Sequence, residues 1–347
     1  MASVTRRVLY FTRPRQIALR EEELEAPGPG QVLVHTLVSA ISPGTEMLIY
    51  RGQMPRGLAV DETIPALAGR LEYPLTYGYA VVGRVVRVGP GVDIGWKGQL
   101  VFAFHPHASH FLAPVDTLHP LPPTLSPEEA LFLPNVETAV NFLMDGRPLI
   151  GERVVIFGQG VVGLLTTALL ARHPLDVLIA LDPLPLRREW ALRLGAHAAL
   201  DPTATDAIAR AREYLAAREM YAGADLVYEV SGNPAALGQA LEVVGFSGRV
   251  VIGSWYGKKQ ARLDLGGRFH RSRARLISSQ VSTIAPEFGG LWTKERRLQL
   301  AWRMVEAIRP ARLITHRVPA EEAATAYALI DTRPEETLQV ILEWDEL

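Results

Sequence analysis

The sequence predicts an α/β protein with two domains: a mostly antiparallel, barrel-like β domain and a doubly wound domain with a parallel sheet. The chain has 347 residues, which suits two domains of about 100–200 residues each. Residues 1–123 are rich in β-branched runs and turn residues, whereas the following residues alternate strand-like with helical runs. Hydrophobic residues make up 48% and charged residues 21%, which excludes disorder for most of the chain.

Strand signals dominate the first domain. Val-rich and Phe-rich runs at 32–42, 80–89 and 99–105 are bounded by turn residues, and 25–31 is a cluster of Gly and Pro. Runs of this kind favour short strands joined by turns. At Ser126 the pattern changes, because Ser, Pro and Glu follow in the order of a helix start with a capping box. A helix is therefore predicted from 126 towards 144, with a break near Pro134.

The middle of the chain alternates strands and helices. The predicted strands are 153–157, 176–182, 224–232, 248–255 and 275–281, with helical runs between the first four. Buried strands separated by helices are typical of βαβ units and a parallel sheet. From Pro286 the chain turns helical again, and it closes on an apolar strand at 337–344.

A glycine motif follows the first of these strands. Gly158, Gly160 and Gly163 form the pattern G-x-G-x-x-G between a strand and a helix. In this setting the three glycines allow a tight turn, close approach of a pyrophosphate and close packing of the helix on the sheet. Val161 and Val162 open the helix, whose free N–H groups would face the diphosphate.

Asp182 ends the next strand, 19 residues after Gly163. A carboxylate there accepts hydrogen bonds from ribose hydroxyls and repels a 2′-phosphate, so the sequence favours NAD(H) over NADP(H). Arg187 and Arg188 leave the opposite choice open, because either could pair with a 2′-phosphate. The alternative without a cofactor is an ordinary glycine turn with an N-capping Asp182.

Composition excludes several classes of function. A net charge of −1 argues against a protein that binds nucleic acid through phosphate neutralisation. The absence of Cys excludes disulfides, thiol nucleophiles, iron–sulfur clusters and zinc sites that contain Cys. The uncharged run 154–171 contains three glycines and is predicted to be a buried strand, turn and helix rather than a membrane span. The Arg-rich start of the chain is interpreted as strands rather than a leader, and a cytoplasmic protein is expected.

The order of these parts resembles the medium-chain dehydrogenase/reductase superfamily of the alcohol dehydrogenase kind, over nearly the whole chain. The stretches SAISPGTE (39–46) and YPLTYGYAVVG (73–83) are most similar to zinc-lacking bacterial members, such as the bacteriochlorophyllide hydroxyethyl dehydrogenase group. The resemblance implies a GroES-like barrel catalytic domain at 1–140 and 283–347, a Rossmann domain at 141–282, and a homodimer.

The resemblance also implies that zinc is absent. Zinc members carry a C-G-T-D motif, which here reads Pro43-Gly44-Thr45-Glu46. Their G-H-E-x-x-G motif here places Tyr79 at the histidine, and the third ligand falls near Pro134. The lobe of four cysteines that holds a structural zinc in the family is missing, so no metal is predicted.

Without zinc, hydrogen-bond donors must stabilise the charge that develops on the substrate oxygen. Tyr79 is the first candidate, and the alternative for it is a core aromatic. Thr45 matches the family's proton-relaying hydroxyl, and the alternative is a turn residue that caps the next helix. His107, in HPHASH at 105–110, is a third candidate for substrate contact. Glu46 is expected to brace the structure, for instance by pairing with an Arg.

Further residues are expected beside the cofactor or the substrate. The resemblance places Glu137 and Thr138 beside the nicotinamide, with Thr138 the better cofactor contact and Glu137 a substrate residue or an exposed helix residue. The loops after two predicted strands are expected to add cofactor contacts and an apolar wall for the substrate. The alternative for the aromatic residues of this wall is ordinary packing. The cofactor contacts are Ser231, Gly253 and Ser254, and the substrate wall is Trp255 and Tyr256.

Three functions remain open at this stage. The favoured one is an NAD(P)-dependent dehydrogenase of a secondary alcohol or its carbonyl compound. The second is an NADPH-dependent reductase of an activated C=C bond, similar to quinone reductases, and the third is an inactive dinucleotide-binding sensor. The substrate is expected to be a small molecule, and no nucleic acid or membrane partner is expected. Basic residues near 258–273 indicate either a solvated face or an anionic substrate.

Overall fold

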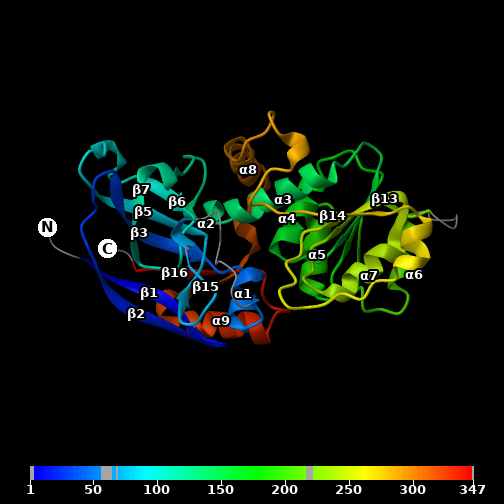
Figure 1. The fold of residues 1–347 in the computed structure, drawn as a ribbon, viewed down its shortest axis with the longest axis horizontal. Helices are drawn as coiled ribbons and strands as arrows, with labels where there is room; N and C mark the ends of the chain where they lie inside the picture. Colours follow the sequence, from blue (N-terminus) through cyan, green and yellow to red (C-terminus); the bar gives the residue numbers. More distant parts are fainter. Residues whose placement is uncertain (1–3, 56–64, 68, 216–221, 346–347) are drawn as a thin grey trace. The chain divides into compact units, whose positions relative to one another are not determined.

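The computed structural model describes residues 4–55, 65–67, 69–215 and 222–345. It divides into two compact units, Met1–Pro134 with Arg309–Leu347, and Asn135–Ile308. Figure 1 colours the chain from blue to red, so that blue, cyan and red elements make the first unit and green to orange elements the second. The second unit is therefore an insertion into the first.

Among its described residues, the first unit holds a seven-stranded and a three-stranded sheet. The neighbouring strands of these sheets pair antiparallel, except for β15 and β16, which are parallel. The larger sheet has the order β15-β16-β3-β5-β6-β8, with β7 also paired to β3, and the smaller has the order β2-β1-β4. The strands are β1 Val4–Arg13, β2 Gln16–Leu24, β3 Gln31–Ala40, β4 Leu75–Thr76, β5 Val81–Val88, β6 Leu100–Ala103, β7 His110–Pro114, β8 His119–Pro120, β15 Ile314–Pro319 and β16 Gln339–Glu343.

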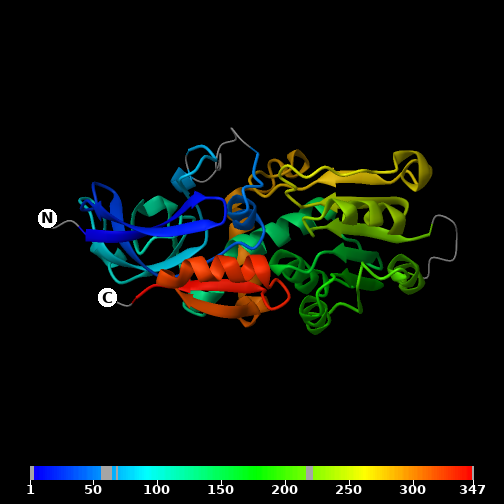
Figure 2. The ribbon, with the colours of Figure 1, turned by 90° about the horizontal axis from the view of Figure 1, so that it is seen from below.

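The alternating valines of the first unit explain its core. Val32 and Val34 on β3 and Val81 and Val85 on β5 are buried in one cluster, as expected where every second residue of a strand faces the interior. Figure 2 shows helix α9 (Ala323–Thr332) beside the hairpin of β1 and β2. A short helix, α1 (Thr45–Tyr50), follows β3.

The predicted helix break is present, and it precedes the proline. Ser126 and Glu129 form the expected capping box at the start of α2 (Pro127–Ala130). The next helix, α3, spans Leu133–Gly146. Pro134 lies in its first turn, where the missing N–H has no intrahelical partner to lose.

The second unit is the predicted doubly wound domain. The six strands that the structure describes in this unit are all parallel, in the order β11-β10-β9-β12-β13-β14. The strands are β9 Arg153–Phe157, β10 Val177–Leu181, β11 Ala198–Leu200, β12 Ala224–Glu229, β13 Val244–Ile252 and β14 Arg275–Ser278. The remaining helices are α4 Val161–Leu170, α5 Pro185–Arg193, α6 Ala207–Tyr214, α7 Pro234–Val243 and α8 Lys294–Ile308.

The second unit differs from the sequence prediction in its extent and in the bounds of β12, β13 and β14. Residues 283–308, which the prediction gave to the barrel-like domain, belong to the second unit, because Arg297 on α8 is buried against Glu137 on α3. The last parallel strand ends at Ser278 rather than at residue 281.

The apolar run 154–171 forms β9, a turn and α4. In the part of the chain that the structure describes, no helix has the length and hydropathy of a membrane span.

Candidate functional site

The glycine motif forms the turn between β9 and α4. Gly158 has φ of +95°, and a Cβ there would lie 2.5 Å from the Ser231 Cα. A Cβ at Gly163 would lie 2.0 Å from the Gly158 carbonyl oxygen. Gly160 faces open space, with nothing within 4 Å of an added Cβ, and no described side chain caps the helix that begins at Val161. The turn thus leaves room and free N–H groups for an anionic group.

Asp182 joins this turn to the end of β10. The side chain is 2% exposed, and it accepts hydrogen bonds from the backbone N–H of Gln159 at 2.8 Å and of Leu184 at 2.9 Å. Each carboxylate oxygen has two lone pairs, so the group can still accept hydrogen bonds from a ligand. Asp182 is not a helix N-cap, since α5 begins after Leu184.

Two polar groups near this turn are buried without a hydrogen-bond partner among the described residues. They are the Gln159 side-chain amide nitrogen and the Arg187 Nε. Arg187 lies 3.8 Å from Asp182, whereas Arg188 donates to the carbonyls of Asp182 and Pro183. The open Gly160, the uncapped helix and these two donors fit a bound dinucleotide better than a closed turn, because buried donors without partners are costly.

The loops after β12 and β13 are tied together by a buried carboxylate. Glu229 accepts hydrogen bonds from the Ser231 N–H and hydroxyl and from the Tyr256 hydroxyl. Burial, and next the contact with Glu229, raise the pKa of Tyr256 well above its usual range. Ser254 accepts from the Gly232 N–H at 2.8 Å. The hydrogen bond of Tyr256 to Glu229 therefore holds this loop in place. The neighbouring Trp255 is 42% exposed.

Gly253 directly follows β13, next to the Glu229 hydrogen bonds. Its N–H donates to the Glu229 carbonyl at 3.0 Å, and an added Cβ would lie 2.2 Å from the Phe142 ring. The position thus requires glycine for packing. Ser231, Gly253 and Ser254 all lie at the carboxyl ends of the parallel strands, where ligands collect in doubly wound sheets.

Glu137 is neither exposed nor free. Two nitrogens of Arg297 donate to its Oε1 at 2.9 and 3.0 Å, and burial raises the pKa of Glu137. The expectation of an exposed helix residue is thus wrong, and the ion pair occupies the carboxylate that was expected to contact a substrate. Thr138, the next residue on α3, is half-buried.

The predicted basic neighbourhood divides between the two ends of the parallel sheet. In the register of the sheet, Arg275 on β14 lies opposite Arg249 on β13, and Arg249 lies opposite Leu226 on β12. Leu226 in turn lies opposite Val154, near the start of β9. Arg275 is thus level with the amino ends of the strands, away from the glycine turn at their carboxyl ends.

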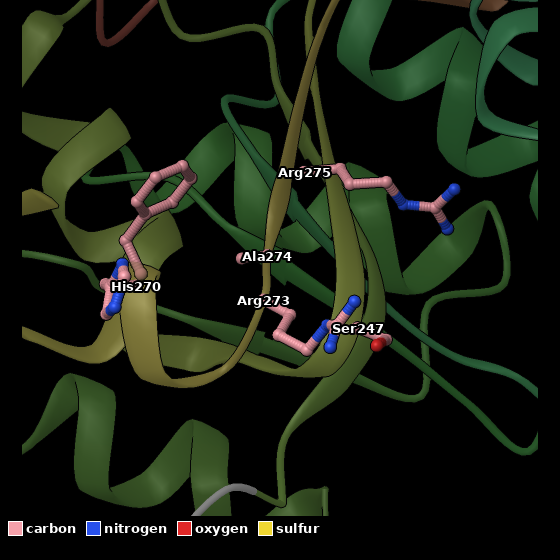
Figure 3. A pocket seen from close by; sticks show the side chains of 6 residues that line it. Ser247, His270, Arg273, Ala274 and Arg275 are labelled. Carbon is pink, nitrogen blue, oxygen red and sulfur yellow. The ribbon is translucent and has the colours of Figure 1, made fainter.

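A hollow lies at this amino end, and Figure 3 shows His270 on one side of it and Arg273 and Arg275 on the other. These three residues do not lie at the glycine turn, so they give no support to an anionic substrate there. Lys259 remains at the carboxyl end, with its Nζ 2.8 Å from the Gly232 carbonyl oxygen.

In the first unit, Tyr79 belongs to a cluster of three hydroxyl residues. Its hydroxyl donates to the Ser42 Oγ at 2.7 Å. The Thr45 backbone N–H also donates to that oxygen, at 3.3 Å. Burial raises the pKa of Tyr79 to about 12, and hydrogen bonds from Ser42 and Thr45 oppose that rise. The phenol is therefore protonated at neutral pH and able to donate a hydrogen bond.

His107 lies apart from this cluster in a closed interior network. Its side chain is wholly buried, with Nε2 3.0 Å from Glu46 and Nδ1 2.8 Å from the Ser39 hydroxyl. Both ring nitrogens thus have partners, and the structure offers His107 no route to a ligand. The predicted role in substrate contact does not agree with this placement.

Glu46 braces the structure, as expected, but without an Arg. It accepts hydrogen bonds from the Ser42 N–H at 2.8 Å, from His107 and from the Tyr327 hydroxyl on α9. Trp344 completes the network by donating to Ser39 at 3.0 Å. Four segments of the first unit are thereby held around one carboxylate.

Comparison with known proteins identifies relatives over nearly the whole chain. Residues 161–294 match the family model described as zinc-binding dehydrogenase. The 2-desacetyl-2-hydroxyethyl bacteriochlorophyllide A dehydrogenase of Cereibacter sphaeroides is 27% identical, with 97% of each chain covered. The L-threonine 3-dehydrogenase of Pyrococcus horikoshii is 28% identical over 69% of this chain and 73% of its own.

A solved structure agrees with these matches. An alcohol dehydrogenase of Escherichia coli CFT073, complexed with NADH, has a TM-score of 0.77 at 19% identity, and the alignment covers 98% of this chain and 99% of its own. In sequence and in fold, this chain is similar to the dehydrogenases of the medium-chain dehydrogenase/reductase superfamily. The predicted resemblance and the predicted fold class, a GroES-like barrel with a Rossmann domain, are confirmed.

The residues at the positions that the resemblance assigns to zinc do not all offer a donor atom. Pro43 and Pro134 stand at two of the positions that the resemblance assigns to ligands, and a proline side chain has no donor atom. The described residues contain no group of three His, Asp or Glu that could hold a metal ion. His105 in HPHASH stacks on Phe111 instead, and burial lowers its pKa to about 4.

Sequence reasoning missed three residues that organise these sites. Ser42 is part of the stretch SAISPGTE, but only the structure shows the contact with Tyr79. Tyr327 lies 281 residues from Glu46, and Arg297 lies 160 residues from Glu137. A lone Arg in a charged helix gives no signal in the sequence that it is buried.

Proposed function

We propose that this chain is a zinc-independent oxidoreductase that transfers a hydride between NAD(H) and a secondary alcohol or its carbonyl compound. The observation that carries the proposal is the Tyr79 hydroxyl, a protonated donor within a hydroxyl cluster at the position where zinc members have a histidine ligand. The names of the relatives, a hydroxyethyl bacteriochlorophyllide dehydrogenase and a threonine 3-dehydrogenase, support oxidation of an alcohol.

The residues present would hold a nicotinamide dinucleotide, which supplies or accepts the hydride when bound. The open turn at Gly160 and the N–H groups of Val161 and Val162 would bind the diphosphate. Asp182 would accept hydrogen bonds from the adenosine ribose, and Ser231 and Ser254 border the remaining part of the cofactor.

At the substrate, Tyr79 would donate a hydrogen bond to the reacting oxygen. Negative charge builds on this oxygen as a hydride reaches the carbonyl carbon, and a fixed donor stabilises that charge more in the transition state than in the ground state. Thr45 would support the donor from the adjacent turn. His107 has no part in this scheme, because its ring is enclosed.

The function is tested by assaying NADH formation and consumption. Secondary alcohols, including L-threonine, and the matching ketones are expected to turn over with NAD(H). Turnover of enones with NADPH, and of no alcohol, would instead establish a reductase of C=C bonds. NADH binding without turnover of either panel would indicate a sensor.

We predict that the purified protein contains no stoichiometric zinc. Pro43 and Tyr79 replace two family ligands, so chelators should leave NADH binding unchanged. Elemental analysis after extensive dialysis checks this, with a zinc-containing alcohol dehydrogenase treated in parallel as the control. One zinc per chain in the dialysed protein would contradict the prediction.

We predict that NADH binds more tightly than NADPH because Asp182 repels a 2′-phosphate. Asp182→Ala should weaken NADH by about 1–3 kcal/mol, the range for hydrogen bonds to a charged group, and should weaken NADPH less. Asp182→Asn is a second variant, because it removes the charge and keeps the size and one acceptor oxygen, although the amide can accept from only one of the two backbone N–H groups of Gln159 and Leu184. A titration in which the wild type prefers NADPH would reverse the assignment and point to Arg187.

A further inference from the structure

Ser42 holds the position next to the proposed donor. It follows β3, is 8% exposed, and its backbone N–H donates to the buried Glu46 at 2.8 Å. Glu46 is itself fixed by His107 and Tyr327. The Ser42 hydroxyl therefore sits on a rigid support, as a group that must meet Tyr79 at a constant distance requires.

The hydrogen bonds of Ser42 leave it one free hydrogen. A hydroxyl has one hydrogen to donate and two lone pairs that accept. The Thr45 N–H can only donate, so it uses one lone pair of the Ser42 Oγ, and the Tyr79 hydroxyl uses the other. The hydrogen of Ser42 is then available to a third group, or to Tyr79 when Tyr79 gives up its own.

The surroundings of Ser42 indicate where a proton can enter. Glu46 and His107 are wholly buried, whereas Ser42 keeps part of its surface exposed. The contact of Ser42 with Glu46 runs through the backbone N–H, which does not transfer protons. The relay therefore requires that solvent reach the Ser42 hydroxyl from the exposed 8% of this residue.

We propose that Ser42 returns the proton to Tyr79, so that the two hydroxyls form a relay between the substrate oxygen and water. This inference rests on the proposed function. In carbonyl reduction, bound NADH would supply the hydride for the new C–H bond, and the carbonyl oxygen would take the Tyr79 proton. In the same concerted step the Ser42 proton passes to the Tyr79 oxygen, and a solvent proton replaces it on Ser42. The sum is a ketone, NADH and one proton giving an alcohol and NAD⁺, and oxidation runs the same steps in reverse.

Thr45 is the competing relay residue, and the structure favours Ser42. Both hydroxyls act on the phenol, but the 2.7 Å contact is that of Ser42, which the Thr45 backbone N–H in turn holds at 3.3 Å. Of the two hydroxyls, Ser42 also has the larger effect in opposing the raised pKa of Tyr79. A group that stabilises the phenolate more is better suited to restore its proton.

The first experiment needs no substrate. Protein labelled with ¹³C at the tyrosine Cζ gives one resonance per tyrosine, and Tyr79→Phe identifies that of Tyr79. Ser42→Ala should shift the Tyr79 resonance, because the phenol loses its acceptor, whereas Thr45→Val should shift it less. An unchanged Tyr79 resonance in a folded Ser42→Ala protein would overturn the proposal.

The second experiment measures turnover with the best secondary alcohol and ketone of the NAD(H) panel. Ser42→Ala should lower kcat by about 10²-fold, near the lower end of what a general acid–base group contributes, with KM unchanged and a changed solvent deuterium isotope effect on kcat. Ser42→Thr keeps a hydroxyl and should restore kcat to within a few-fold of the wild type. A purely structural serine would not change the isotope effect.

The outcomes separate the two proposals. If Tyr79→Phe lowers kcat and Ser42→Ala leaves both kcat and the isotope effect at wild-type values, the relay is overturned and the proposed function stands. If Tyr79→Phe itself retains wild-type kcat, the relay and the donor role of Tyr79 both fail, since Ser42 acts only through Tyr79, while the oxidoreductase activity stands. The proposed function fails if the wild type turns over neither alcohols nor ketones with NAD(H). If Ser42→Ala does not fold, Ser42→Thr and the labelled wild type decide, and low kcat in a folded Ser42→Thr protein would count against the relay.

Discussion

Replacing Tyr79 by Phe is expected to lower kcat by about 10²–10³-fold, the range observed when one oxyanion donor is removed. The substitution keeps the ring of residue 79, which packs edge-to-face with the Tyr77 ring at 6.2 Å between the two ring centroids. It removes only the hydroxyl that donates to Ser42. NADH affinity should persist, because every residue assigned to the dinucleotide lies in the other unit.

Tyr73→Phe is the matched control for this result. Tyr73 also belongs to the 73–83 stretch, and its hydroxyl donates to the Ile49 backbone carbonyl, so it has a structural partner. Its loss should cost about 1 kcal/mol of folding free energy and leave kcat near the wild-type value. If both variants lose stability alike and neither loses turnover, Tyr79 is a core aromatic and the donor must be sought elsewhere.

The pH dependence provides a second check on Tyr79. Its pKa is raised to about 12, so the phenol keeps its proton through the neutral and mildly alkaline range. Carbonyl reduction should therefore show no loss of kcat from ionisation of Tyr79 below about pH 11. A fall in kcat with an apparent pKa of about 8–9 that disappears in Tyr79→Phe would contradict this placement of the phenol.

The parts of the molecule that depend on local sequence were predictable. The turn at Gly158–Gly163 lies within six residues of chain, and its steric demands follow from the missing Cβ atoms. The capping box at Ser126 and Glu129 is local in the same way. The resemblance located Tyr79 by position in a motif, which does not depend on knowing its neighbours.

The residues that organise the sites were not predictable in this way. Ser42 contacts Tyr79 only because the end of β3 returns next to the start of β5, across 37 residues. His107 was expected at a ligand, yet its place beside Glu46 depends on how three separate segments pack. Contacts between distant segments carry no periodicity, so a single sequence does not reveal them.

Arg297 illustrates the same limit and leads to the second large effect. It is the largest side chain in the described chain that is wholly buried. Besides Glu137, it donates to the Asn141 side chain at 2.5 Å and to the carbonyls of Val281 and Thr283. It thereby connects α3, α8 and the segment after β14 in the second unit. The sequence placed it in a charged helix, with nothing to distinguish it from exposed arginines nearby.

Arg297→Met is expected to lower the free energy of unfolding by about 3–5 kcal/mol, the cost of removing one partner of a buried ion pair. The methionine fills part of the space, but the Glu137 carboxylate and the Asn141 oxygen lose their donors. Arg303→Met, on the exposed side of the same helix, is the matched control and should change stability by less than about 0.5 kcal/mol. Chemical denaturation of the two variants measures the difference.

The double variant Glu137→Gln with Arg297→Met should recover part of the loss, because it removes the charge left without a partner. The pH dependence follows with a definite sign. Burial already raises the pKa of Glu137, and loss of Arg297 raises it further, so the charged form becomes more costly in the folded state. The deficit of Arg297→Met should therefore grow as pH rises above the unfolded-state pKa of about 4.3 and shrink below it. A deficit that is equal at pH values of about 4 and 8, and equal again in the double variant, would show that Arg297 stabilises the unit by packing rather than by neutralising Glu137.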